Sequence, residues 1–367
     1  MRIALPLILT LSVAATGCVN LGPRALEAGR ADYNQVLRDT ADQQLLANLV
    51  RLRYRDRPYY LEVSAVTTQF SFSPSVGVTG ALGSPELEQD LLIGGNAAYQ
   101  EQPTVSYAPL QGDEFARRLL TPVTLDALVL LSHSGWSIER LLRICVQRVN
   151  GIPNAVTASG PTPDEAPAYE NFLEVARALR RLQVRDQMAI GYLQEGRAAE
   201  ADDADADGTA IMFTESALES EEYRLLVDRL GLAPGRRQYR LAAALRGGGG
   251  EVIGIQTRSL NGMLYYLAHA VRVPPGHLDR GLVNVTRHAD GRTFDWGRMT
   301  GGLMEVRASG DVPADAAVRV RYRDRWYYIA DADLDSKSTF SLLAQLFALQ
   351  AGGGDGLRPV LTLPVGG

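Results

Sequence analysis

The spacing of apolar and polar residues along the chain predicts both helices and strands. Between residues 32 and 54 apolar residues recur at helical spacing, which is typical of a helix with one buried face. The same spacing predicts helices over residues 113–120, 125–132, 138–149, 169–187, 219–230, 260–271 and 333–350. Alternation typical of strands occurs over residues 59–73, 104–107, 210–213, 238–245, 251–256, 303–308, 317–322 and 326–329.

These elements predict an α+β fold. The N-terminal half is helix-rich with short strands, and the C-terminal half is sheet-rich and closed by the last helix. The glycine run at 247–250 predicts a hairpin between the strands on either side, because glycine adopts positive φ freely. Asp335 or Ser336 is expected to cap the last helix. Loops are expected around five glycines, Gly77, Gly80, Gly83, Gly94 and Gly95.

An acidic segment of alanine and aspartate at residues 198–208 divides the chain. Residues 31–197 are expected to form a mainly helical domain or half, and residues 209–367 an α+β domain or half. A stretch rich in proline, alanine, threonine and serine at 153–167 predicts a linker or long loop.

One short sequence occurs twice with a single change: YRDRPYY at residues 54–60 and YRDRWYY at residues 322–328. The first copy is predicted to end a helix, whereas the second lies between two strands. Chance reuse of a turn-forming Arg-Asp-Arg sequence is the preferred interpretation. The alternative is a pair of aromatic and arginine patches that recognise one partner.

Composition and charge exclude several classes of protein. The 367 residues are 46% hydrophobic and 22% charged, as in ordinary globular proteins. A net charge of −5 without a basic cluster argues against nucleic acid as a partner. No glycine spacing matches a phosphate-binding or dinucleotide-binding motif, so no nucleotide is expected. After residue 18, no apolar run approaches the ~20 residues of a membrane helix.

The first residues have the features of an export signal. Arg2 is followed by an apolar run over residues 3–13, which is too short to span a bilayer. The small residues that end in Cys18 resemble the lipobox of bacterial lipoproteins, in which the cysteine is lipidated and becomes the new N-terminus. This resemblance implies a signal peptide over residues 1–17, lipidation of Cys18 and a tether over residues 18–30.

The same resemblance implies a location. Residue 19 is Val19 and not the aspartate that retains many Gram-negative lipoproteins in the inner membrane. The family rule therefore implies an outer-membrane lipoprotein that faces the periplasm, with the membrane as partner through the lipid anchor. Residues 43–64 and 335–350 also resemble uncharacterised lipoproteins of proteobacteria, a resemblance that implies no activity.

A weak calcium motif lies in the acidic segment. Asp203, Asp205 and Asp207 are followed by a glycine, as in the opening of a calcium-binding loop. Ala210 and Thr214 stand where that pattern requires a hydrophobic residue and a glutamate. A solvated low-complexity loop is therefore preferred over a calcium site, and no other cofactor is expected.

Other reactive residues have structural interpretations. Cys145 lies in an apolar helical stretch and is expected to be buried and inert. The histidines show no zinc-binding spacing, and a capping role is preferred over catalysis for the His133-Ser134 pair. Paired carboxylates can hydrolyse glycosidic bonds, but acids before a helix also favour its dipole, and the second reading is preferred for three residues, Asp331, Asp333 and Asp335.

These observations favour a non-enzymatic lipoprotein that acts as a structural or assembly partner in the cell envelope, bound to another envelope protein. Catalytic residues dispersed along the chain leave no motif, so enzymatic activity stays open. The two alternatives are an envelope hydrolase acting on glycan or peptide and a carrier of lipid or another ligand.

Overall fold

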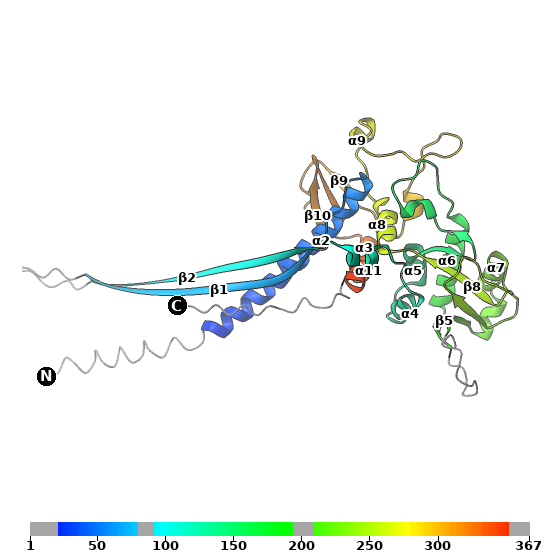
Figure 1. Ribbon diagram of the computed structural model, residues 1–367, viewed down its shortest axis with the longest axis horizontal. Coiled ribbons are helices and arrows are strands. Elements are labelled where there is room, and N and C mark those ends of the chain that lie inside the picture. Colours follow the sequence, from blue (N-terminus) through cyan, green and yellow to red (C-terminus); the bar gives the residue numbers. More distant parts are fainter. Residues whose placement is uncertain (1–20, 80–91, 194–207, 352–367) are drawn as a thin grey trace, which may run out of the picture. The chain divides into compact units, whose positions relative to one another are not determined.

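The computed structural model describes residues 21–79, 92–193 and 208–351 (Figure 1). It confirms the α+β class, with a helix-rich N-terminal half and a sheet-rich C-terminal half. The described residues form two units. Residues 60–79 and 92–111 make up a hairpin unit, and the remaining described residues make up the main body.

The hairpin unit consists of two long antiparallel strands, β1 (Leu61–Thr79) and β2 (Leu92–Pro109). The sequence predicted shorter strands separated by glycine loops, and this prediction was wrong. Gly77 and Gly94 lie inside the strands, opposite each other, and Gly95 lies opposite a valine. Backbone N–H and C=O groups form the hydrogen bonds between paired strands. Glycines can therefore take part in the pairing although they have no side chain to pack. Residues 80 and 83 lie outside the described residues.

The main body contains a six-stranded sheet in the order β4-β3-β8-β7-β6-β5. Neighbouring strands are antiparallel except β7 and β8, which are parallel. The strands on either side of the acidic segment, β5 and β6, pair with each other. The bounds are β3 (Val146–Val149), β4 (Ile152–Pro153), β5 (Met188–Tyr192), β6 (Thr209–Phe213), β7 (Gln238–Ala242) and β8 (Val252–Thr257).

The parallel pairing of β7 and β8 corrects the predicted hairpin. The chain between them, residues 243–251, crosses back to the end of the sheet at which β7 begins, so β8 runs in the same direction as β7 instead of reversing in a tight turn. Asn150 holds this return, because its Oδ1 accepts hydrogen bonds from the backbone nitrogens of Gly247 (3.0 Å) and Gly254 (2.6 Å). A Cβ atom at Gly254 would lie 2.7 Å from the Gly247 nitrogen. Glycine therefore permits a close backbone crossing here, and not the hairpin turn that the sequence suggested.

A second, three-stranded sheet has the order β10-β11-β9 and is antiparallel throughout. Its bounds are β9 (Arg307–Ser309), β10 (Ala316–Tyr322) and β11 (Arg325–Ala330). Arg323 and Asp324 form the turn between β10 and β11, and Arg323 adopts a φ of 53°. Positive φ at this position is typical of the tight turns that match strand twist.

Helices make up most of the remaining described chain. The predicted helix over 138–149 ends at residue 145, because residues 146–149 pair with β8 as a strand. The predicted helix over 169–187 ends at residue 184, and residues 188–192 form β5. The bounds are α2 (Leu21–Arg53), α3 (Asp113–Leu120), α4 (Leu125–His133), α5 (Ile138–Cys145), α6 (Glu170–Val184), α7 (Glu221–Leu230), α8 (Leu260–Ala268), α9 (Pro275–Asp279), α10 (Gly297–Thr300) and α11 (Leu334–Ala351), with short 3₁₀ turns η2 (Val156–Ser159) and η3 (Glu215–Glu219).

The last helix is capped by a different residue from those predicted. Asp333 immediately precedes α11, and its Oδ1 accepts a hydrogen bond from the backbone nitrogen of Ser336 at 3.0 Å. The helix therefore begins at Leu334, one residue before the predicted cap Asp335. An aspartate here satisfies a free N–H group and interacts favourably with the helix dipole.

The core of the main body lies where α2, α8 and the three-stranded sheet meet. Leu46 and Leu49 of α2 are fully buried, as are Met263 and Leu264 of α8. Burial of each such side chain stabilises the fold by about 1.5–3 kcal/mol. Among the described residues, no helix combines the length and apolarity needed to cross a membrane.

Candidate functional site

The two copies of the repeated heptapeptide contact each other in the main body. Tyr54 follows α2, and its hydroxyl lies 2.5 Å from the hydroxyl of Tyr327 on β11. The same Tyr54 hydroxyl lies 2.6 Å from Nδ1 of His277 on α9. His277 contacts Asp324 in the β10–β11 turn, with 2.9 Å between Nε2 and Oδ1. A continuous polar chain therefore runs from Asp324 through His277 and Tyr54 to Tyr327, which we name the tyrosine–histidine cluster.

A second set of contacts covers this cluster. Asp56 accepts hydrogen bonds from the hydroxyl of Tyr322 and from Nη2 of Arg323, the latter at 3.0 Å. The guanidinium of Arg323 also lies 5.1 Å from the centre of the Tyr54 ring, within cation–π range. The first copy therefore contributes the Asp56 carboxylate and the Tyr54 ring, which contact Tyr322 and Arg323 of the second copy.

The copies also share a backbone conformation. Arg55 and Arg323 occupy the same position in the two sequences, and their φ angles are 59° and 53°. The predicted contexts are confirmed, because the first copy ends α2 and the second joins β10 to β11. Their mutual contact was anticipated by neither interpretation of the sequence.

The burial of the cluster decides what it can do chemically. Tyr54 is 4% exposed and Tyr327 is fully buried. Burial raises the pKa of both tyrosines, and the hydrogen bond from His277 lowers the pKa of Asp324. The order carboxylate, imidazole, hydroxyl resembles that of a nucleophile-activating triad. Here the Tyr54 hydroxyl is buried, and its contacts with His277 and Tyr327 tie the end of α2 to α9 and to β11.

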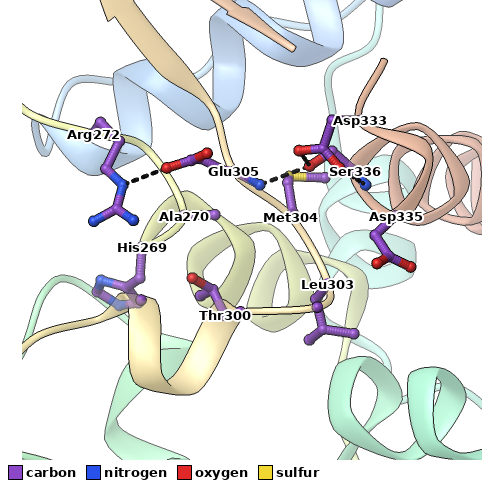
Figure 2. A pocket seen from close by; sticks show the side chains of 13 residues that line it. His269, Ala270, Arg272, Thr300, Leu303, Met304, Glu305, Asp333, Asp335 and Ser336 are labelled. Carbon is purple, nitrogen blue, oxygen red and sulfur yellow. Dashed lines mark hydrogen bonds and ion pairs between the residues drawn. The ribbon is translucent and has the colours of Figure 1, made fainter. Parts of the chain in front are cut away.

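A polar pocket of about 230 Å³ lies between the end of α8, the α10–β9 segment and the start of α11. Figure 2 shows Glu305 between Arg272 and the Asp333–Ser336 pair. Glu305 accepts a hydrogen bond from Nε of Arg272 at 2.9 Å, and its backbone nitrogen donates to Oγ of Ser336 at 2.8 Å. The polar groups at the centre of this pocket are therefore committed to one another.

A neighbouring cleft of about 470 Å³ shares Asp335 and the 301–303 wall with this pocket. Arginines dominate its lining. Arg140 lies 2.6 Å from Asp335, and Arg143 lies 3.0 Å from Glu139 and donates to two backbone carbonyls near α10. The remaining two are Arg177 and Arg180. Four arginines against two carboxylates leave the cleft with excess positive charge, which suits an anionic group.

The three predicted acids before α11 have separate partners. Asp331 pairs with Nζ of Lys337 at 2.7 Å, Asp333 caps α11, and Asp335 pairs with Arg140. The helix-capping interpretation is thus confirmed for Asp333, while Asp331 and Asp335 form ion pairs at the start of the helix. Each of the three carboxylates therefore has a partner within the protein.

The other predicted residues of the main body have structural roles. Oγ of Ser134 donates to the carbonyl of Leu130 at 2.8 Å and caps the end of α4, as expected. Cys145 is fully buried, as predicted, and burial raises the pKa of its thiol to about 12. His269 lines the pocket of Figure 2 but stacks on Trp296, with 3.7 Å between ring centroids.

The remaining predicted sites lie outside the described residues. These are the lipidation residue Cys18 and the weak calcium ligands Asp203, Asp205 and Asp207. Within the ranges that the structure covers, no three metal-ligating side chains converge on one point. The tyrosine–histidine cluster was missed as a site, and its sequence signal was the repeated heptapeptide. His277 carried no signal of its own.

Comparisons with known proteins gave no match, whether with family models, curated proteins or solved structures.

Proposed function

We propose that this protein is a lipid-anchored outer-membrane lipoprotein that faces the periplasm and acts as a structural or assembly partner in the cell envelope. The observation that carries this proposal is the hairpin unit. Its two strands have 19 and 18 residues and form a sheet of their own among the described residues. An isolated two-stranded hairpin is marginally stable in water, so such an extension is typical of an element that gains stability on binding a partner.

The start of α2 adds to the proposal. The helix begins at Leu21, so most of the tether expected over residues 18–30 is helical. A helix of 33 residues is about 50 Å long at about 1.5 Å per residue. With Cys18 lipidated, the N-terminal part of this helix would join the membrane to the main body, into whose core Leu46 and Leu49 of the same helix pack. Such a stiff link suits a component that holds a fixed place in an assembly.

The anchor is tested by fractionating cells that produce Cys18→Ser. We expect this variant to move from the membrane fraction to the soluble periplasm, because a lipid anchor supplies about 0.8 kcal/mol per buried methylene. Cys145→Ala is the matched control, since it removes the other cysteine and should stay with the membrane. Unchanged membrane association of Cys18→Ser would refute the anchor.

The assembly role is tested by replacing residues 62–109 with a short glycine–serine linker. The hairpin is a separate unit, so the main body should retain its folded circular dichroism spectrum. Mild crosslinking followed by mass spectrometry should then recover the envelope partner with the intact chain and not with the variant. Equal recovery with both chains would contradict the role of the hairpin.

A further inference from the structure

The cleft of about 470 Å³ beside α5 and α6, which we name the arginine cleft, is built by two helices that pack against each other. Arg140 and Arg143 lie on α5, and Arg177 and Arg180 lie on α6. Residues three apart in a helix share a face, so each helix contributes a pair of neighbouring arginines to the lining. Residues 301–303 and the start of α11 close the third side.

The two arginines of α5 are held in place by the protein itself. Arg143 is 4% exposed. Its Nη1 donates to Glu139 at 3.0 Å, and its Nη2 donates to two backbone carbonyls near α10 at 2.7 and 2.9 Å. Arg140 donates to Oδ1 of Asp335 at 2.6 Å and to the backbone carbonyl of Asp335 at 3.1 Å. These contacts fix the positions of both guanidinium groups.

The two arginines of α6 keep donors for a ligand. The side chain of Arg177 is 56% exposed, and its Nε lies 3.9 Å from Glu139, beyond hydrogen-bond distance. Arg180 donates through Nη1 to Oε1 of Gln183 at 2.6 Å. Among the described residues, no carboxylate forms an ion pair with Arg180. A guanidinium has five N–H donors, so both side chains can bind a ligand without breaking a hydrogen-bonded ion pair.

The balance of charge favours a ligand with two negative charges. Four guanidinium groups and two carboxylates, Glu139 and Asp335, line the cleft, which leaves an excess of two positive charges. Like charges gathered in one cleft repel one another, and a bound anion removes this repulsion. A phosphate monoester carries a charge of about −1.5 to −2 at pH 7. The planar guanidinium also matches the oxygens of a phosphate in pairs.

The lining restricts the group to which the phosphate is attached. Among the described residues that line the cleft, Leu303 has the one apolar side chain, and no aromatic ring is present. A nucleobase therefore finds no ring on which to stack. Ser137 precedes α5 without capping that helix, so its hydroxyl is available to a polar ligand. The volume of the cleft is typical of small-molecule sites, so a small polar group fits beside the phosphate.

We infer that the arginine cleft binds the phosphate of a small polar phosphomonoester. Arg177 and Arg180 make the principal contacts, and Arg140 and Arg143 supply fixed charges beside them. The same phosphate chemistry occurs on a soluble polyol phosphate and on a lipid headgroup. Since α5 and α6 position all four arginines, the site needs neither the hairpin unit nor the lipid anchor.

The first test is calorimetric titration of the full chain carrying Cys18→Ser with glycerol 3-phosphate at pH 7 and ~0.15 M ionic strength. We expect saturable binding. Arg177→Gln/Arg180→Gln should bind at least about tenfold more weakly, because it loses charge-assisted hydrogen bonds to the phosphate. Circular dichroism checks that the variant is folded. Arg177→Gln alone, at the more exposed position, should weaken binding in the same direction and serves if the double variant does not fold.

A matched control separates the cleft from net charge. Arg236→Gln/Arg292→Gln removes the same charge from two exposed arginines outside the cleft, which pair with Glu251 and Asp290. It should leave the affinity nearly unchanged, because separated surface charges are screened at this ionic strength. Equal weakening by the two double variants would overturn the inference. Tighter binding of succinate, a dicarboxylate, than of glycerol 3-phosphate would also overturn it.

Vesicles distinguish the two sources of the phosphate. The same chains are floated with phosphatidylcholine vesicles that contain or lack phosphatidic acid, whose headgroup carries a phosphomonoester. Binding that needs both phosphatidic acid and the two arginines of α6 would support the site and assign it to a lipid headgroup. Binding of glycerol 3-phosphate without such vesicle binding would support the site and assign it to a soluble ligand. Failure of the chain to bind either probe through these arginines would overturn the inference.

Discussion

Arg258 offers the sharpest test of how the main body is held together. Its side chain is fully buried, and no ion pair among the described residues includes it. Burial lowers its pKa to about 10, so it remains charged at neutral pH. The guanidinium lies 4.1 Å from the centre of the Tyr266 ring. It donates to Ser159 Oγ and to four backbone carbonyls, those of Arg143, Ile144, Val146 and Asn154.

The effect of Arg258→Met can be worked out from these acceptors. The carbonyls of Arg143 and Val146 also accept from Nδ2 of Asn154, at 2.9 and 2.7 Å, and keep that donor. The carbonyls of Ile144 and Asn154 lose the guanidinium, and each buried group left unsatisfied costs about 1–3 kcal/mol. Removal of an unpaired buried charge offsets part of this. We expect a net loss of about 2–4 kcal/mol in the free energy of unfolding.

The shared acceptors give a second, more demanding expectation. In the double variant Arg258→Met/Asn154→Ala, the carbonyls of Arg143 and Val146 lose both donors. The double variant should therefore be destabilised by more than the sum of the single variants, by about 1–3 kcal/mol. Equilibrium unfolding in urea at pH 7 measures all three. Arg292→Met is the control, because this exposed arginine should change stability by less than about 0.5 kcal/mol. Additive single effects would refute the shared-acceptor argument.

Two further predictions concern Gly247 and His269. Gly247→Ala should destabilise the fold by about 1–3 kcal/mol in urea unfolding, because the added Cβ would collide with the carbonyl of Val252. Gly248→Ala, which has no neighbour within 4 Å, should be nearly neutral, and equal effects would contradict the close crossing. Burial lowers the pKa of His269 well below 6.5, so below that pH the unfolded chain binds a proton that the folded chain does not. The contribution of His269 to stability is therefore present above pH 6.5 and is lost as the pH falls below it, relative to His269→Phe. Urea unfolding at several pH values measures this, and parallel pH profiles of the two proteins would refute it.

Much of the fold could be predicted from local pattern. The helical spacing identified α3, α4 and α11 within one or two residues, and the apolar stretch around Cys145 correctly predicted its burial. These features depend on residues close together in the sequence, where side-chain periodicity is decisive. The α+β class follows from the same local signals.

The errors arose where distant residues decide the structure. Residues 146–149 leave the helical pattern because they pair with β8, more than a hundred residues along the chain. The glycines at 247 and 254 support a parallel crossing, and this depends on Asn150, which no local pattern connects to them. The tyrosine–histidine cluster likewise joins Tyr54 to His277 and Tyr327, and spacing along the sequence carries no information about that contact.

The antiparallel pairing of β5 with β6 makes covalent continuity between them dispensable. Both strands belong to the six-stranded sheet, and that sheet also joins β3 to β8 across the same point in the chain. After cleavage between residues 193 and 208, the two fragments would therefore stay associated in the folded state and separate only in denaturant. New termini could be opened at this position, and a reporter domain inserted there, without dividing the sheet.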